Sequence, residues 1–213
     1  MKKKTERLME VLSGQPVIPV LKIDRIADAV PLVRALAKGG LPAVEITLRT
    51  PDAIDAIRLV ASDVPEAIVG AGTILTGKDY SAAEAAGAQF IVSPGTTQEL
   101  LDAANRSSVP FLPGAITPSE IMAMREEGYR VLKFFPAEQA GGAAFLKSLS
   151  APLPDMRFCP TGGISPDNAR DYLTLANVVC VGGSWVAPGK EIAAGDWSAV
   201  EELARAATML ARQ

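Results

Sequence analysis

Lys133 has the clearest chemical meaning of any residue in this sequence. It lies within the apolar run 130–136, RVLKFFP, which has the composition of a short buried strand ending at its proline. Desolvation penalises a buried ammonium, so such a lysine must be paired with an acid or lose its charge. A neutral, desolvated lysine amine is the nucleophile that forms Schiff bases with ketones. Lys133 is therefore a candidate Schiff-base residue, and the alternative is a lysine on the solvent face of an edge strand.

The segment 43–49, AVEITLR, offers a carboxylate and a cation for the same chemistry. Side chains alternate along a strand, so Glu45, Thr47 and Arg49 share one side and the apolar residues share the other. A carboxylate on an inward side needs a partner, and an amine from another strand would provide one. Glu45 is then a candidate general acid–base, and Arg49 a candidate for binding a substrate carboxylate. A structural ion pair between Glu45 and Arg49 is the alternative.

Two glycine-rich segments, TGG at 161–163 and GGS at 182–184, end the last two strands that the pattern predicts. Glycine tolerates positive φ angles and lets backbone N–H groups approach an anion closely. One Gly-Gly pair is often only a turn, but two pairs at consecutive strand ends favour a phosphate site. The candidates for that site are Gly162, Gly163, Gly182, Gly183 and Ser184.

Composition excludes several other classes of site. The 213 residues contain no histidine, which removes serine–histidine and cysteine–histidine nucleophiles and histidine-ligated zinc. Cys159 and Cys180 lie in apolar runs and are expected to be buried thiols. A net charge of −3 with no basic stripe argues against a nucleic-acid partner. No apolar run is long enough to span a membrane, and the charged start lacks a signal-peptide core, so we expect a cytoplasmic protein without a membrane partner. We also expect no metal and no cofactor, because no motif for either is present.

Short strands alternate with helical segments along the chain, the pattern of repeated βα units. Strands are predicted at 17–22, 43–48, 67–72, 89–93, 109–113, 130–134, 156–160 and 177–182. Helices are predicted at 5–13, 25–38, 51–62, 77–86, 96–105, 118–127, 138–149, 166–174 and 197–211. This pattern indicates an α/β protein with a single (β/α)8 barrel domain, residues 1–213, and an extra N-terminal helix. An open doubly wound sheet is the competitor, but it normally has a glycine fingerprint after the first strand.

In such a barrel the C-terminal strand ends converge on one face, so the chemical groups above would meet there. Thr73 would add a hydroxyl at the mouth, and Phe135, on the same side of its strand as Lys133, would shield the amine from water. An amine, a carboxylate, a guanidinium and a phosphate site together fit cleavage of a carbon–carbon bond in a phosphorylated keto acid. The cleavage would proceed through an imine and without a metal.

The motifs also resemble a known family. The chain resembles the 2-keto-3-deoxy-6-phosphogluconate (KDPG) aldolases from about residue 10 onward. The similar segments are VEITLRT at 44–50, GAGT at 70–73, KFFPAE at 133–138, FCPTGGI at 158–164 and GGSW at 182–185. The resemblance implies a class I aldolase on a (β/α)8 barrel, usually a homotrimer. Members split KDPG into pyruvate and D-glyceraldehyde 3-phosphate in the Entner–Doudoroff pathway. Many also split 4-hydroxy-2-oxoglutarate into pyruvate and glyoxylate.

Carried over residue by residue, the resemblance gives each matching position a role. It implies that Lys133 forms the Schiff base and that Glu45, with a water molecule, moves protons. It further assigns Arg49 and Thr73 to the pyruvate carboxylate, Pro94, Phe135 and Thr161 to the pocket wall, and Gly162, Gly163 and Ser184 to the phosphate. Three alternatives stay open: a relative that prefers the galactonate epimer, a non-catalytic barrel that binds a phosphate ligand, and an isomerase with Glu45 as base and Lys133 as an electrostatic group.

Overall fold

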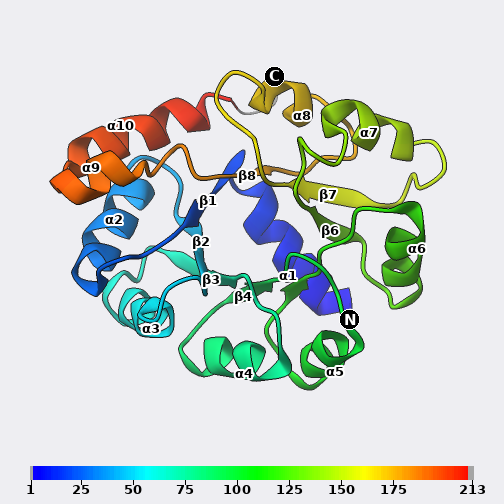
Figure 1. Cartoon of the computed structure of the whole chain (residues 1–213), viewed down its shortest axis with the longest axis horizontal. Coiled ribbons are helices and arrows are strands. Elements are labelled where there is room, and N and C mark those ends of the chain that lie inside the picture. Colours follow the sequence, from blue (N-terminus) through cyan, green and yellow to red (C-terminus); the bar gives the residue numbers. More distant parts are fainter. Residues whose placement is uncertain (1, 211–213) are drawn as a thin grey trace.

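Parallel β-strands surround the centre of the molecule, and most of the helices lie outside them (Figure 1). The computed structural model describes residues 2–210. The strands are β1 (Val17–Leu21), β2 (Ala43–Thr47), β3 (Ile68–Gly72), β4 (Phe90–Val92), β5 (Phe111–Leu112), β6 (Val131–Phe134), β7 (Arg157–Pro160) and β8 (Val181–Gly183).

The helices follow the strands in alternation, with one helix before β1. They are α1 (Lys2–Ser13), α2 (Ile26–Lys38), α3 (Ala53–Asp63), α4 (Gly77–Ala85), α5 (Gln98–Arg106), α6 (Pro118–Glu126), α7 (Gly142–Leu149), α8 (Ala169–Leu173), α9 (Gly189–Ala194) and α10 (Trp197–Thr208). Leu8, Val11 and Leu12 of α1 pack in one apolar cluster with side chains from inside the ring of strands. Helix α1 therefore closes the interior of the ring near the N-terminal ends of the strands.

Six strands form one parallel sheet in the order β5-β4-β3-β2-β1-β8, and β6 pairs with β7. Single bridges join the two sheets: Phe158 to Val178 and Thr161 to Gly182 on one side, and Gly114 to Lys133 on the other. At the second junction the peptide N–H of Lys133 donates to the carbonyl of Pro113, and its carbonyl accepts from Ala115. The sheet is therefore curled, and Lys133 lies where β6 meets the chain that follows β5.

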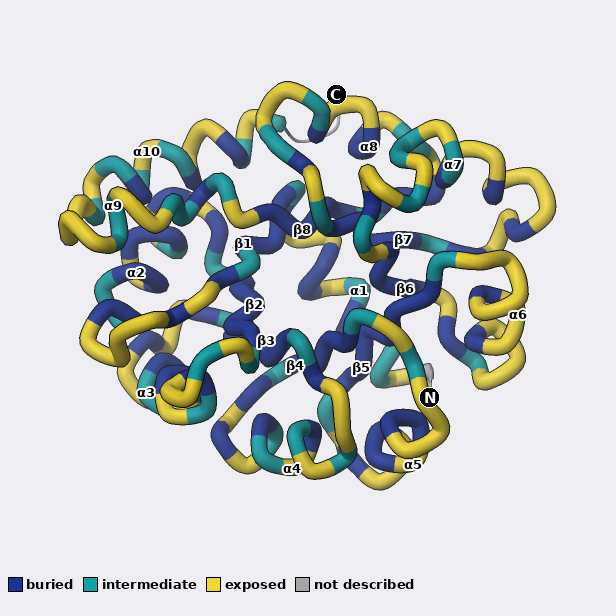
Figure 2. Tube along the Cα trace, viewed as in Figure 1, coloured by how far each residue is buried: buried dark blue, intermediate teal, exposed yellow. Residues whose placement is uncertain are grey.

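Alternation along the strands separates the main core from the interior of the ring. On β2, Val44 and Ile46 belong to the main core cluster, together with helix residues such as Leu32 and Ile57. Glu45 and Thr47 lie between them in sequence and are also buried, so they point to the opposite side. Figure 2 shows the strands as mostly buried, whereas the exposed residues lie on the helices and loops. This placement is what holds polar side chains inside the ring.

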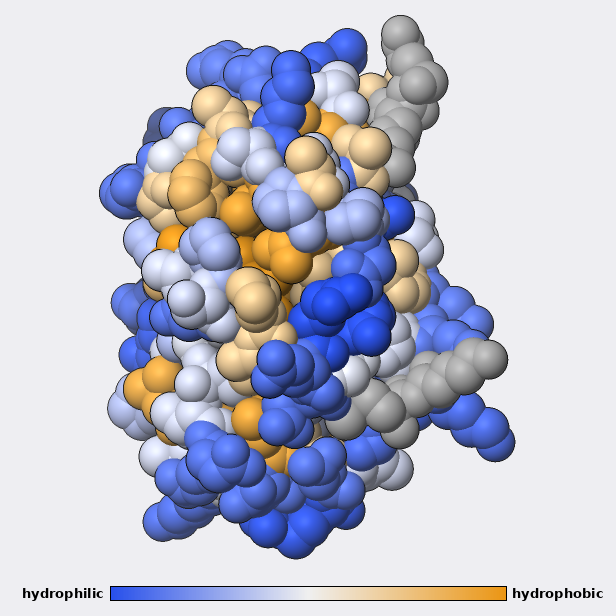
Figure 3. Space-filling view, turned by 90° about the vertical axis from the view of Figure 1, so that its right-hand side faces the viewer, coloured by the Kyte–Doolittle hydropathy of each residue, from blue (hydrophilic) through white to orange (hydrophobic). Residues whose placement is uncertain are grey.

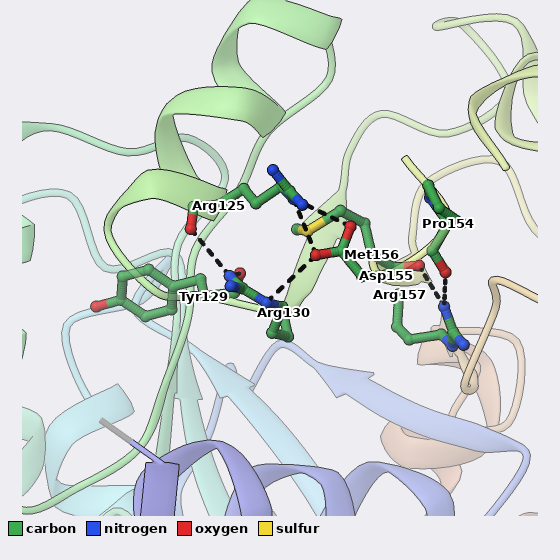
Figure 4. Close-up of polar contacts among 7 residues, drawn as sticks. All are labelled: Arg125, Tyr129, Arg130, Pro154, Asp155, Met156 and Arg157. Atoms are coloured by element: carbon green, nitrogen blue, oxygen red, sulfur yellow. Dashed lines mark hydrogen bonds and ion pairs between the residues drawn. The ribbon is translucent and has the colours of Figure 1, made fainter. Parts of the chain in front are cut away.

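An ion-pair network lies at the N-terminal ends of β6 and β7, away from the C-terminal strand ends (Figure 4). Asp155 accepts hydrogen bonds from Arg125, at 2.9 and 3.0 Å, and forms a 3.5 Å ion pair with Arg130. The Arg125 guanidinium holds the pKa of the Asp155 carboxyl below its ordinary value. Arg157 donates to the carbonyls of Pro154 and Met156. These contacts tie the loops before the two strands together.

Within residues 2–210, element boundaries differ from the predicted ones mostly by one to three residues, with three larger differences. The predicted end of the last helix, residue 211, lies outside the described residues. The helix predicted at 138–149 begins at Gly142, because Gly141 and Gly142 have φ angles of 110° and 64° that interrupt a right-handed helix. The strand predicted at 177–182 is β8 at Val181–Gly183, because residues before it meet β7 only through the bridge at Val178. The short helix α9 was not predicted, and none of its residues is buried.

Candidate active site

Lys133 of β6 and Glu45 of β2 face each other across the inside of the ring. The Lys133 Nζ atom lies 3.0 Å from Oε1 and 3.4 Å from Oε2 of Glu45. Both residues are buried, with 5% and 3% of their surface exposed. The alternative that Lys133 is an exposed edge-strand residue is therefore wrong. Each charge has the partner that burial requires.

The packing of β6 explains why the lysine points inward. Its neighbours Leu132 and Phe134 belong to the main core, and the Phe134 ring stacks on Phe145 of α7 with ring centroids 5.8 Å apart. Lys133 must then point to the opposite side of the strand, into the ring. The Phe135 ring lies 5.5 Å from the amine, in cation–π range, and forms one wall of the cavity around it.

A cavity of about 210 Å³ surrounds the lysine–glutamate pair. Its walls come from the ends of six strands, β1 to β4, β6 and β7, and the segments that follow them. The lining residues are Val20, Glu45, Thr47, Arg49, Thr73, Pro94, Lys133, Phe135 and Thr161. The structure thus brings together all seven residues that were predicted to be catalytic or to contact the keto-acid part of the substrate. Val20 and Thr47 were not predicted to contact the substrate, although alternation did place Thr47 on the inner side.

Thr47 holds Arg49 in place at the rim of this cavity. The Arg49 Nε atom donates to the Thr47 hydroxyl oxygen at 2.9 Å, and that hydroxyl donates to the carbonyl of Leu21 at 2.8 Å. Within residues 2–210, no ion pair joins Arg49 to an acid, and Glu45 pairs with Lys133 instead. The alternative of a structural Glu45–Arg49 ion pair is therefore wrong. The ends of the guanidinium are left to bind a carboxylate in the planar, two-point geometry that arginine favours.

Two threonines in the cavity have features typical of ligand sites. Thr73 has a φ of 59°, which is unfavourable for a β-branched residue, and such strain concentrates at functional positions. The hydroxyl of Thr161 is buried and has no hydrogen-bond partner among the described residues. An unpaired buried hydroxyl is costly, so a ligand that supplied a partner would gain from it.

The two glycine pairs turn out to differ. Gly162 and Gly163 have φ angles of 101° and 76°, whereas Gly182 and Gly183 have no positive φ. A Cβ at Gly182 would lie 2.3 Å from the Thr161 hydroxyl oxygen, so this glycine makes room for Thr161. The expected positive φ angles therefore exist only in the first pair.

Ser184 lines a neighbouring cavity of about 570 Å³ that adjoins the smaller one. Val20 and Arg49 contribute to the walls of both cavities. The bridge between Thr161 and Gly182 keeps the two glycine segments side by side. Thr161 lines the smaller cavity and Ser184 lines the larger one, so each glycine segment reaches the wall of one cavity. Gly162, Gly163, Gly182 and Gly183 line neither of these two cavities.

Beneath the pair, two free thiols are in contact. Cys159 is the register partner of Lys133, and its sulfur lies 3.5 Å from that of Cys180. The hydrogen bond from the Cys180 thiol to Cys159, together with burial, raises the pKa of Cys180 well above its ordinary value. Across residues 2–210, no cluster of three or more His, Cys, Asp or Glu side chains is arranged to hold a metal ion. No helix in that range is both long and apolar enough to cross a membrane.

The chain is similar to known aldolases in both sequence and structure. The model of the KDPG and KHG aldolase family matches residues 8–203. The 2-dehydro-3-deoxy-phosphogluconate aldolase of Pseudoalteromonas atlantica is 50% identical over 198 residues, 93% of this chain and 92% of that protein. The crystal structure of KDPG aldolase from Legionella pneumophila, with pyruvate captured as a covalent carbinolamine, is 46% identical, with a TM-score of 0.92 over 94% and 97% of the two chains. The Zymomonas mobilis enzyme with 3-phosphoglycerate is 42% identical, with a TM-score of 0.93 over 98% of each chain.

Proposed function

We propose that this chain, which belongs to the KDPG and KHG aldolase family, is a class I aldolase that forms a Schiff base at Lys133. It cleaves KDPG to pyruvate and D-glyceraldehyde 3-phosphate, the reaction of the Entner–Doudoroff pathway. By its family it also cleaves 4-hydroxy-2-oxoglutarate to pyruvate and glyoxylate. The observation that carries the proposal is the buried contact between Lys133 and Glu45 at the bottom of a cavity. The captured carbinolamine in the Legionella relative supports the same chemistry.

The first half of the reaction builds the imine. A proton passes from Lys133 to Glu45 along their 3.0 Å hydrogen bond, which leaves a neutral amine beside a carboxylic acid. The amine attacks the C2 ketone and forms a carbinolamine. Glu45 then returns the proton to the departing hydroxyl group, and water leaves as the protonated imine forms.

The second half breaks the C3–C4 bond. Glu45 is now a carboxylate and removes the proton of the C4 hydroxyl through a water molecule. The electrons of the C3–C4 bond flow into the protonated imine, so an aldehyde departs and an enamine remains on Lys133. Protonation of the enamine at C3 and hydrolysis of the resulting imine release pyruvate and restore the amine.

Substrate orientation is assigned to the remaining groups of the site. Arg49 and Thr73 bind the carboxylate next to the reacting ketone, and Pro94, Phe135 and Thr161 enclose the three-carbon part of the substrate. Gly162, Gly163, Gly182, Gly183 and Ser184 are assigned to the phosphate end, with Gly182 contributing the space for Thr161. Phe135 also limits water access to the amine, which protects the imine until the aldehyde has left.

We further infer that the curled sheet is a complete (β/α)8 barrel, that residues 1–213 are one domain, and that α1 is an additional N-terminal helix. The bridges at both ends of the β6–β7 pair support a closed ring. Location in the cytoplasm, and the absence of nucleic-acid, membrane and cofactor partners, stay predictions.

The decisive experiment is reductive trapping of the imine. Incubation with pyruvate and borohydride should attach a three-carbon group to Lys133, which peptide mass spectrometry locates. Lys133→Met should abolish both labelling and cleavage, while Lys147→Met, on the exposed side of α7, should leave both unchanged. Cleavage without labelling would reject the Schiff base in favour of an isomerase-like or other mechanism. Phosphate binding with neither labelling nor cleavage would indicate a non-catalytic barrel. Parallel cleavage assays with KDPG and with its galactonate epimer decide which of the two substrates the enzyme prefers.

We also propose a homotrimer. Large apolar side chains remain on the surface of the single chain, and Leu75 and Met122 are 56% and 53% exposed. Figure 3 looks at the side of the molecule that carries α6 and α7, and apolar residues gather near the middle of that face. Met122 belongs to α6. Such surface is often covered by another subunit. Light scattering during gel filtration should give about three times the 22.3 kDa of one chain, and a stable monomer would overturn the assignment.

A further inference from the structure

The turn at Gly162 and Gly163 is held from behind by a series of hydrogen bonds to its carbonyl groups. The carbonyl of Thr161 accepts from the N–H of Ala137 at 2.8 Å, and that of Gly162 accepts from the N–H of Glu138 at 3.2 Å. The third carbonyl, that of Gly163, accepts from the side-chain amide of Asn168 at 3.1 Å. Two of these three anchors are backbone groups, so Asn168 is the only anchor in the set that is a side chain.

These anchors fix the direction of the N–H groups in the same turn. In a planar trans peptide the C=O of one residue and the N–H of the next point in opposite directions. With its carbonyl groups turned toward Glu138 and Asn168, the turn directs the N–H groups of Gly163 and Ile164 away from those residues. Among the described hydrogen bonds, neither N–H group donates to a protein acceptor. Successive free N–H groups of this kind form an anion-binding nest.

Asn168 contacts the turn at two points. Its Nδ2 atom donates to the carbonyl of Gly163, and its Oδ1 atom accepts from the N–H of Ser165 at 2.8 Å. The side chain therefore spans residues 163–165 and holds them in one conformation. Gly163 has no stiffness of its own, because a glycine at a φ of 76° has many other accessible conformations.

We propose that Asn168 is a positioning residue that sets the selectivity of the enzyme for phosphorylated substrates. It holds the Gly163 carbonyl in place, and the N–H of Ile164 is thereby presented to the phosphate group. Loss of the amide would leave the catalytic pair intact but would let the turn rotate, so the phosphate end of a substrate would lose a preorganised donor. This inference rests on the proposed function, since it concerns the phosphate end of the same substrate.

The test compares ligands with and without phosphate in Asn168→Ala. We expect the KM for KDPG and the inhibition constant of inorganic phosphate to rise about fivefold or more, the usual effect of one lost hydrogen bond. The rate of borohydride trapping with pyruvate, which has no phosphate, should stay within about twofold of the parent value. Asn105→Ala is the matched control, because Asn105 is exposed at the end of α5.

Asn168→Asp tests the structural contribution alone. Aspartate retains an oxygen to accept from Ser165, so thermal stability should recover, but its negative charge would itself repel phosphate, and the phosphate-specific defect is therefore judged in the neutral Asn168→Ala. The inference is overturned if KDPG binding and pyruvate trapping weaken equally, or if neither changes in either variant. Failure of the parent protein to trap pyruvate would instead reject the proposed function, so the two failures are distinguishable.

Discussion

Gly72 of β3 leaves open the space that the carboxylate of Glu45 fills on the neighbouring strand. A Cβ atom at residue 72 would lie 1.9 Å from Oε1 of Glu45, far closer than two such atoms can approach. The strands are parallel here, and Thr47 is the register partner of Gly72. The position of the Glu45 carboxylate is therefore set by the absence of a side chain on the next strand.

We expect Gly72→Ala to displace the carboxylate away from Lys133. Overpacking of this kind costs about 1–3 kcal/mol of folding stability, and misplacing a catalytic group lowers turnover by about tenfold or more. Thermal melting and steady-state KDPG cleavage would measure the two effects. Gly189→Ala is the matched control, because a Cβ at Gly189 has no heavy atom within 4 Å. Parent-like turnover in Gly72→Ala would show that the carboxylate position is not critical.

Glu45→Gln should separate proton transfer from pocket shape. The amide has nearly the same volume as the carboxylate but cannot take a proton from Lys133 or from the C4 hydroxyl. We expect turnover to fall by about two to four orders of magnitude, the usual loss for a general acid–base group. Circular dichroism should show a folded protein, and slow labelling by pyruvate and borohydride should persist. Turnover near that of the parent would assign proton transfer to another group.

Thr161→Val should have opposite effects on stability and on substrate binding. The buried hydroxyl lacks a protein partner, so its replacement by a methyl group should leave the melting temperature unchanged or raise it. If a bound substrate supplies the missing partner, the KM should rise by about threefold to tenfold. Calorimetry and steady-state kinetics would show both effects. A lower melting temperature with an unchanged KM would mean that the hydroxyl serves the fold.

The two thiols should resist alkylation in the folded protein. The pKa of Cys180 is raised by its hydrogen bond to Cys159 and by burial, so less of it is thiolate at any given pH. Because only the thiolate reacts, we expect iodoacetamide to modify the native protein about a hundredfold or more slowly than an unfolded chain. Mass spectrometry should find two modified cysteines in guanidinium chloride and almost none without it. Rapid labelling of the native protein would indicate that β7 and β8 open readily.

The contact between Lys133 and Glu45 could be predicted although 88 residues separate them. Alternation fixed the side on which each residue lies, and the curled parallel sheet brought the two strand ends to the same face. A charged residue within an apolar strand is an unusual signal, and a second one of opposite sign explained it. The residues with ordinary sequence context were harder to assign.

Thr47, Gly182 and Asn168 are residues of this ordinary kind, whose roles could not be predicted from the sequence. Their roles depend on a neighbour brought close only by folding: Thr47 on Arg49, Gly182 on Thr161, and Asn168 on the Gly163 carbonyl. No periodicity marks such pairs. The helix α9 was missed for a related reason, because a six-residue helix without a buried face leaves no apolar pattern to detect.

The backbone of Lys133 also has a consequence for how the enzyme acquires activity. Its N–H and C=O make the hydrogen bonds that join β6 to the segment after β5, while its side chain carries the reacting amine. The backbone bonds between β6 and the segment after β5, and the contact of the amine with Glu45, therefore depend on the same residue. A folding intermediate that lacked this junction would not hold the amine at Glu45, so we expect activity to appear only after β6 has joined its neighbour.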